Sequence, residues 1–300
     1  MHPASPHPPC PPREAWQPAA SGSLRRLAGF LRVLDVDAVD AHRHAASFEQ
    51  IREGTLGAVV VHGVMRQDEI AELLHAAEHA EPPLPQSSFP APFRSRFLGR
   101  NLNLMHPALE AYFEEAATFN AQLAALPPSP EGLVARVTAL LSALDRGARF
   151  EAAPGPAPGL RYMFTTLRDH RPGGFIPPHF DNEMRLRPSY RHLSTLVNQD
   201  LLSFVLALSC AEAGGALEVF DLRCTAAQAR LISDDRVTDP PSTANSASVT
   251  FRLPPGSLIV LDSGRLLHQL TTVHGAVARR TVCSFMARSL ACEAINYCWG

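Results

Sequence analysis

Hydrophobic and polar residues follow a helical period in the first half of the chain. Apolar residues recur every three or four positions in three segments, 67–80, 108–126 and 129–144. This spacing predicts three amphipathic helices. We expect Ser129 to be the N-cap of the last helix, with Pro130 at its first helical position. The β-branched run 57–65 predicts a strand, and the Pro-rich stretch 81–92 predicts a loop.

The pattern changes near residue 151, after which short apolar runs replace helical periodicity. The strand-like runs are 160–168, 201–210, 216–222, 248–253, 257–262, 266–272 and 280–287. Clusters of Gly, Pro or Asp separate them, which is typical of a sandwich, jelly roll or barrel. A polar loop, 233–247, interrupts the series and is either a lid or an insertion without fixed structure.

These patterns predict an α+β protein in three parts. Residues 1–23 are rich in Pro, Ala and Ser and are expected to form a disordered tail. Residues 24–150 are expected to supply an N-terminal strand and supporting helices, and residues 151–300 a β-rich core. We expect the core to carry the chemistry, because the polar motifs described below lie in it.

The composition of the chain excludes several classes of function. The 300-residue chain has a net charge of −2, so no overall field favours nucleic acid or a membrane surface. Its 27 basic residues are all Arg, which excludes lysine Schiff-base enzymes and P-loops that need a phosphate-binding Lys. The six cysteines show no CxxC spacing and are expected to be reduced thiols. With no secretion signal and no long apolar run, we expect a cytoplasmic protein.

One short motif, 177-PPHFDNE-183, places an imidazole and a carboxylate two positions apart. In a strand, His179 and Asp181 would point to the same side. Such a pair can bind a divalent metal, form a hydrogen bond, or lie on a polar surface. His268, in a later strand-like run, is a candidate third ligand, with His274 as its rival. Two His and one carboxylate would leave three coordination positions of Fe(II) open.

The order of these residues resembles that of the Fe(II)/2-oxoglutarate-dependent dioxygenases, and within them the branch similar to prolyl hydroxylases. Three blocks carry the resemblance: 173–183, 213–222 and 254–285. It implies a double-stranded β-helix, also called a jelly roll, for residues 151–300. It also implies that His179, Asp181 and His268 are the catalytic iron ligands.

The resemblance further implies an arginine that binds the distal carboxylate of 2-oxoglutarate. Arg280 is the preferred residue and Arg279 the alternative, because the gap after His268 is longer than expected for this branch. Tyr162 is a candidate second donor to 2-oxoglutarate. Arg168 either lines the substrate entrance or is solvated. The loops 84–106, 182–200 and 225–247 are expected to select the substrate.

The implied reaction is hydroxylation of a small molecule, an amino acid or a natural-product intermediate. O₂ and 2-oxoglutarate would be consumed, succinate and CO₂ released, and ascorbate is a candidate reductant. Halogenases of the superfamily replace the carboxylate ligand with Gly or Ala, so Asp181 favours hydroxylation. The alternative is a cupin-like jelly roll that acts as an isomerase or a binding module. Cupins, however, use HxH with a Glu in their first motif.

Overall fold

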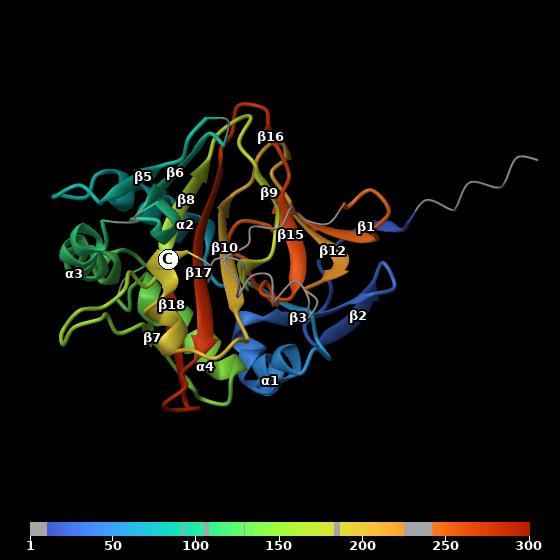
Figure 1. Cartoon of the computed structure of the whole chain (residues 1–300). Coiled ribbons are helices and arrows are strands. Elements are labelled where there is room, and N and C mark those ends of the chain that lie inside the picture. Colours follow the sequence, from blue (N-terminus) through green and yellow to red (C-terminus); the bar gives the residue numbers. More distant parts are fainter. Residues whose placement is uncertain (1–10, 92, 105–107, 129, 183–186, 225–241) are drawn as a thin grey trace, which may run out of the picture.

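The computed structural model describes residues 11–91, 93–104, 108–128, 130–182, 187–224 and 242–300. Ser129, and most of the loop 233–247, lie outside these ranges. Two β-sheets face one another, and helices cover the outer side of the larger sheet (Figure 1). None of the described helices is long and apolar enough to cross a membrane.

The larger sheet runs through β2 (Ser23–Leu27), β3 (Leu31–Asp37), β4 (Ala58–His62), β14 (Leu258–Leu261), β10 (Leu202–Ser209), β17 (Arg279–Arg288), β8 (Thr166–His170), β6 (Ser95–Leu98) and β5 (Gln86–Ser88). β18 (Ile295–Trp299) pairs with β17, and β7 (Arg149–Ala152) pairs with β18. The central strands β4 and β14 consist almost entirely of buried β-branched and leucine residues, as expected for strands covered on both faces.

The smaller sheet runs in the order β1 (Arg13–Ala15), β13 (Ser248–Phe251), β12 (Leu217–Arg223), β15 (Leu266–Leu270) and β9 (Ile176–His179). Successive strands alternate between the two sheets, from β8 to β9, β10 to β12, β13 to β14 and β15 to β17. This alternation gives the jelly roll that the sequence predicted. β11 (Ala213–Gly214) and β16 (Val273–His274) form a separate two-stranded ribbon.

The helices pack on the outer face of the larger sheet. They are α1 (Ser47–Arg52), α2 (Gln67–Glu78), α3 (Leu109–Ala125) and α4 (Leu133–Leu144), with 3-10 turns at Ala38–His44, Leu102–Leu104, Pro188–Tyr190 and Leu193–Thr195. Apolar side chains from α2, α3 and α4 share one core with outward-facing residues of β10 and β17. A second core, which includes Val219 and Phe251, fills the space between the sheets.

The helix and strand predictions are largely confirmed. β5 lies inside the stretch 81–92, which was predicted to be a loop, and three further differences concern other segments. α4 begins at Leu133, after Gly132 with its φ of 80°, and not next to Ser129. β8 begins only at Thr166, because the residues before it pack against α3. The predicted tail is ordered from residue 11, since β1 pairs with β13 and Trp16 is buried between the sheets.

The boundary expected near residue 150 does not separate two bodies. Strands β2, β3 and β4 continue the sheet that contains β14 and β10, so the N-terminal part and the jelly roll share one sheet. The supporting helices then cover the outer face of that sheet and leave its inner face to the cavity described next.

Candidate metal centre and its cavity

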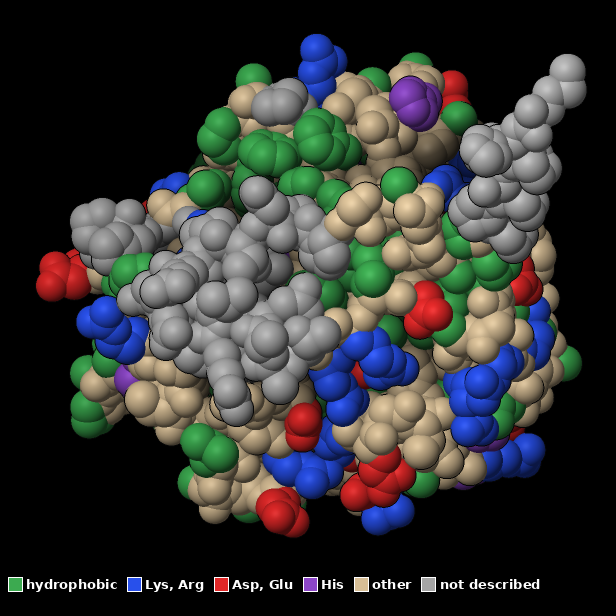
Figure 2. Space-filling model, turned by 45° about the vertical axis from the view of Figure 1, so that its right-hand side comes forward, with side chains coloured by type: hydrophobic (Ala, Val, Ile, Leu, Met, Phe, Trp, Pro, Cys, Tyr) green, Lys and Arg blue, Asp and Glu red, His purple; other side chains and the backbone are tan. Residues whose placement is uncertain are grey.

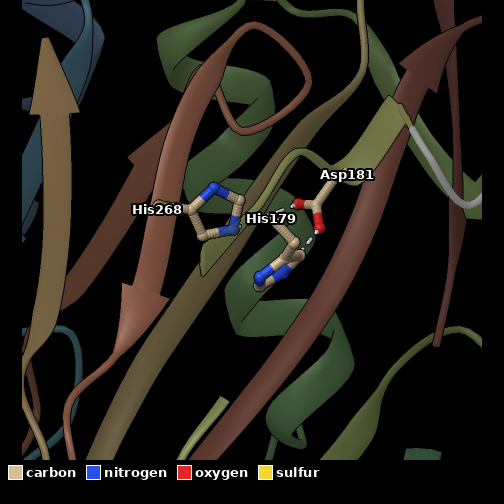
Figure 3. A group of neighbouring side chains, drawn as sticks. All are labelled: His179, Asp181 and His268. Carbon is tan, nitrogen blue, oxygen red and sulfur yellow. Dashed lines mark ion pairs between the residues drawn. The ribbon is translucent and has the colours of Figure 1, made fainter. Parts of the chain in front are cut away.

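His179, Asp181 and His268 meet on the smaller sheet, where they point into the space between the sheets (Figure 3). His268 on β15 lies directly opposite His179 on β9, and their ring centroids are 4.4 Å apart. Asp181 follows β9 by two residues. Its carboxylate oxygens lie 3.4 Å from Nε2 of His179 and 3.8 Å from Nε2 of His268. One ligand atom from each of the three lies within 4.8 Å of the others.

Backbone carbonyl groups orient both imidazoles. Nδ1 of His179 lies 2.8 Å from the carbonyl oxygen of Pro177, and Nδ1 of His268 lies 3.0 Å from that of Leu266. A carbonyl oxygen only accepts, so each Nδ1 carries a proton and each Nε2 faces Asp181. Such outer hydrogen bonds fix the tautomer and the ring angle of metal-binding histidines.

The protonation states suit metal binding. Burial, together with the neighbouring His179, lowers the pKa of His268 to about 4, so the ring is neutral near pH 7. Burial acts to raise the pKa of Asp181, but the nearby imidazoles outweigh it, and this pKa lies below its ordinary value. The site therefore offers the neutral imidazole of His268 and the carboxylate of Asp181 to a metal ion.

The donor set fits a ferrous ion. Asp181 is almost fully buried, and its Oδ2 has no hydrogen-bond partner among the described residues. An unpaired buried carboxylate oxygen is costly unless a cation compensates it. Two histidines and one carboxylate on one side of Fe(II) leave three positions for 2-oxoglutarate and O₂. The rival His274 is exposed on β16 and is not part of this group.

A cavity of about 600 Å³ opens beside the metal centre, between the inner faces of the two sheets. The smaller sheet contributes His179 and His268. The opposite wall comes from β6, β8, β10 and β17, and the mouth is lined by residues between β5 and β6, such as Phe89 and Phe93. Most of the lining is apolar, as is typical of a site for a small molecule.

The structure places Arg279, and not Arg280, in this cavity. Arg280 points to the other side of β17, where its guanidinium lies 2.8 Å from the carboxylate of Glu78. Thr281, Cys283 and Phe285 share the face of Arg279 and also line the cavity. Arg280, the residue preferred from the sequence, therefore lies on the outer face of β17, and the alternative Arg279 lies on the inner face. Val282 and Leu206, on the outer face, pack under the helices.

Arg279 is half-buried and has no carboxylate within ion-pair distance in the described part of the chain. Burial lowers its pKa to about 10, which still leaves it charged at pH 7. Two positions along the strand, Thr281 is buried, and its Oγ1 has no hydrogen-bond partner among the described residues. These two neighbouring donors can receive one anion.

Tyr162 does not reach the cavity. It precedes β8 and is buried against α3, with its ring centroid 4.9 Å from that of Phe113. Its hydroxyl lies 3.2 Å from Nδ1 of His192. The candidate role in binding 2-oxoglutarate rested on a strand beginning at residue 160, whereas β8 begins later.

The sequence analysis did not predict that two residues of β8, Arg168 and His170, belong to the site. The sequence left Arg168 open between the substrate entrance and a solvated surface, and it predicted no role for His170. Both line the cavity. His170 is fully buried with Nδ1 2.8 Å from Oγ of Ser95, and burial keeps its pKa well below the usual range. The two residues are two positions apart on β8 and therefore share the strand face that lines the cavity.

Comparisons with known proteins place this site in a class. The sequence model of a family described as carrier-protein-independent halogenase WelO5 matches residues 30–300. The chain therefore belongs to this family, and it is an enzyme of the Fe(II)/2-oxoglutarate-dependent oxygenase superfamily. Fe(II) is its cofactor and 2-oxoglutarate its cosubstrate, and the cupin alternative no longer stands. No curated protein sequence matches the chain.

Solved structures show the same fold. An N-substituted L-amino acid dioxygenase from Burkholderia ambifaria AMMD, also solved in complex with alpha-KG, superposes with a TM-score of 0.53 at 15% identity, over 85% of this chain and 91% of that one. A 2OG-Fe(II) oxygenase family oxidoreductase from Burkholderia pseudomallei reaches a TM-score of 0.44 at 15% identity, over 91% and 93% of the two chains.

Proposed function

We propose that this protein hydroxylates an unactivated C–H bond of a small molecule, an amino acid or a natural-product intermediate. In the balanced reaction, one O₂ and one 2-oxoglutarate convert the C–H group to C–OH and yield succinate and CO₂. The observation that carries the proposal is Asp181, whose buried carboxylate lies beside both imidazoles. These three residues would supply all the protein ligands that a hydroxylase needs.

Each part of the cavity has a role in this proposal. His179, Asp181 and His268 would hold Fe(II), which when bound supplies the O₂ activation. Arg279 and the hydroxyl of Thr281 would hold the distal carboxylate of 2-oxoglutarate, because a guanidinium fork and a neighbouring hydroxyl can bind one carboxylate together. The apolar walls exclude water from the reacting groups.

Asp181 is the reason to favour hydroxylation although the family is described by its halogenases. A halide ligand needs a coordination position that the protein leaves open. Here the carboxylate is 1% exposed and oriented by its neighbours, so a halide would have to displace a buried ligand. Displacement would leave the carboxylate buried without a counter-charge, which is strongly unfavourable.

A halide titration tests this choice. The anaerobic complex with Fe(II) and 2-oxoglutarate should show a weak visible charge-transfer band. We expect that chloride and bromide at constant ionic strength leave the band of the unmodified protein unchanged. Asp181→Gly, which opens the position, should give a band that moves with halide if it retains iron. A saturable halide shift in the unmodified protein would favour halogenation and contradict the proposal.

A further inference from the structure

Arg168 is a second cation in the cavity, and the proposed function gives it no role. It projects from β8 into the space between the sheets. Its guanidinium carbon lies 4.8 Å from the ring centroid of Phe97 and 5.3 Å from that of Phe285. Its Nε donates to Oγ1 of Thr166 at 3.1 Å. Contact with two rings holds the planar group in a defined position before any ligand arrives.

The guanidinium of Arg168 lacks an anionic partner. Its Nη2 is buried and has no hydrogen-bond partner in the described ranges. No described carboxylate lies within 4.0 Å of it, whereas other arginines such as Arg52 and Arg265 form close ion pairs. A charge in a largely apolar cavity without a counter-ion is unfavourable. Arg168 therefore needs an anion that the described side chains do not supply.

Fe(II) and 2-oxoglutarate do not supply that anion either. Fe(II) brings two positive charges, and Asp181 removes one of them. The two carboxylates of 2-oxoglutarate carry two negative charges, and Arg279 adds one positive charge. With neutral imidazoles, the charges of these groups sum to zero. The positive charge of Arg168 is then left without a counter-charge. One further monoanion would balance the charge of Arg168; Arg187, which also lines the cavity, is not included in this sum.

The strand register separates the two arginines. Arg279 lies opposite His170 on β8, whereas Arg168 lies opposite Thr281 on β17 and opposite Phe97 on β6. Arg168 thus lies on the neighbouring strand, beside Thr281 and two positions along from Arg279, and next to Phe97. If 2-oxoglutarate extends between the metal and Arg279, Arg168 faces the side from which a substrate enters.

That side of the cavity is hydrophobic. The ring centroids of Phe89 and Phe97 are 4.6 Å apart, and those of Phe93 and Phe175 are 5.5 Å apart. Leu104, at 42% exposure, lies at the same mouth. Hydrophobic side chains also gather on the upper part of one face of the molecule (Figure 2). Such rings can stack on an apolar or aromatic body and bury its surface.

We propose that the substrate is a hydrophobic carboxylic acid, with its carboxylate held by Arg168 and its apolar body against the phenylalanines of the mouth. This inference rests on the proposed function, since the charge balance assumes Fe(II) and 2-oxoglutarate. The acid would be oriented with one end fixed at β8 and a C–H bond directed toward the metal centre. The arginine acts in substrate positioning, and its removal should affect the substrate and not the cosubstrate.

Matched acids and amides test the proposal. Binding of 4-phenylbutyrate, indole-3-propionate and decanoate to the anaerobic Fe(II)/2-oxoglutarate complex would be measured by calorimetry, each against its primary amide. We expect at least one acid to bind about 10- to 100-fold more tightly than its amide, the range of a charge-assisted contact. Arg168→Gln should remove this preference and leave the 2-oxoglutarate titration unchanged. Arg168→Lys, which keeps the charge without the fork, should lose only part of it.

Arg280→Leu serves as the control, because that residue lies outside the cavity, and it should bind acids as the unmodified protein does. Equal binding of every acid and amide, or no acid binding at millimolar concentration, would overturn the proposal. It would also fail if Arg168→Gln weakened 2-oxoglutarate as strongly as it weakened the acid. If Arg168→Gln does not fold, the acid–amide comparison in the unmodified protein decides alone. A missing charge-transfer band would instead refute the proposed function.

Discussion

Replacing Arg279 by Leu should raise the 2-oxoglutarate requirement, whereas replacing its neighbour Arg280 should not. The two residues are adjacent in sequence but point to opposite sides of β17. A charge-assisted hydrogen bond contributes about 1.5–3 kcal/mol. A fork that donates two such bonds from a half-buried position, discounted for solvent screening, is worth about 3 kcal/mol, which corresponds to about 100-fold in Kd.

The control has a much smaller expected effect. Arg280 pairs with Glu78 on the surface, where the two side chains are 33% and 41% exposed, and such pairs contribute about 0–1 kcal/mol to stability. Arg280→Leu should therefore change the Kd of 2-oxoglutarate by less than about 2-fold.

The assay is a titration of the anaerobic Fe(II) protein with 2-oxoglutarate, followed by the visible charge-transfer band. Circular dichroism checks that each variant is folded. Thr281→Val, which removes the neighbouring hydroxyl, should give an intermediate loss of about 10-fold. If Arg280→Leu weakens 2-oxoglutarate and Arg279→Leu does not, the assignment of the inner face of β17 is refuted.

Three further predictions concern the metal centre, the fold and pH. Asp181→Ala should weaken Fe(II) binding and abolish 2-oxoglutarate turnover, measured as succinate release; full turnover would show that the carboxylate is not a ligand. Arg52 donates to both oxygens of Asp145 at 2.9 and 2.7 Å, and its side chain is 8% exposed. Arg52→Leu should lower the free energy of unfolding, measured in urea, by about 3–5 kcal/mol. Arg146→Leu breaks the pair of Arg146 with Glu49, whose side chains are 65% and 39% exposed, and should lower the free energy of unfolding by about 1 kcal/mol or less. Equal losses in the Arg52 and Arg146 variants would contradict this reasoning. Burial lowers the pKa of His170 and His268, so the unfolded chain takes up protons first and the apoprotein should melt at lower temperature as pH falls from 6.5 toward 4. His170→Asn should flatten that slope, and a melting temperature independent of pH would refute it.

The sequence was most informative where a motif and a strand pattern coincided. His179 and Asp181 follow Pro-rich residues at a strand end, and His268 lies in an apolar run, so the three could be proposed together. The structure brings them within 4.8 Å because β9 and β15 are neighbours with the two histidines in register. The spacing of short runs predicted a sandwich, jelly roll or barrel, and the family resemblance implied the jelly roll among them. No single run specifies which strand it pairs with.

The inner face of β17 could not be predicted because both faces of this strand are buried. Val282 packs under the helices and Cys283 faces the cavity, and both are compatible with a core. Alternation then gives the parity of Arg279 and Arg280 but not the side on which the metal lies. A strand with one solvated face would have resolved this ambiguity.

The N-terminal strands β1, β2 and β3 were not predicted, for a different reason. β2 and β3 contain Arg and Asp at positions that a propensity argument assigns to loops, and β1 has only three residues. They form because they extend a sheet that the rest of the chain provides. Trp16 is buried by that pairing, although its sequence neighbourhood is rich in Pro and Ala. Long-range pairing of this kind leaves no local pattern.

The most direct test of the account is an anaerobic titration of the apoprotein with Fe(II) and then with 2-oxoglutarate. The account predicts that iron binding saturates near one equivalent per chain and that 2-oxoglutarate then produces the charge-transfer band of its chelate. His179→Ala and His268→Ala should each abolish both signals. Iron binding without the band would show a metal site of another kind. An unmodified protein that binds no iron would contradict the assignment of these three residues.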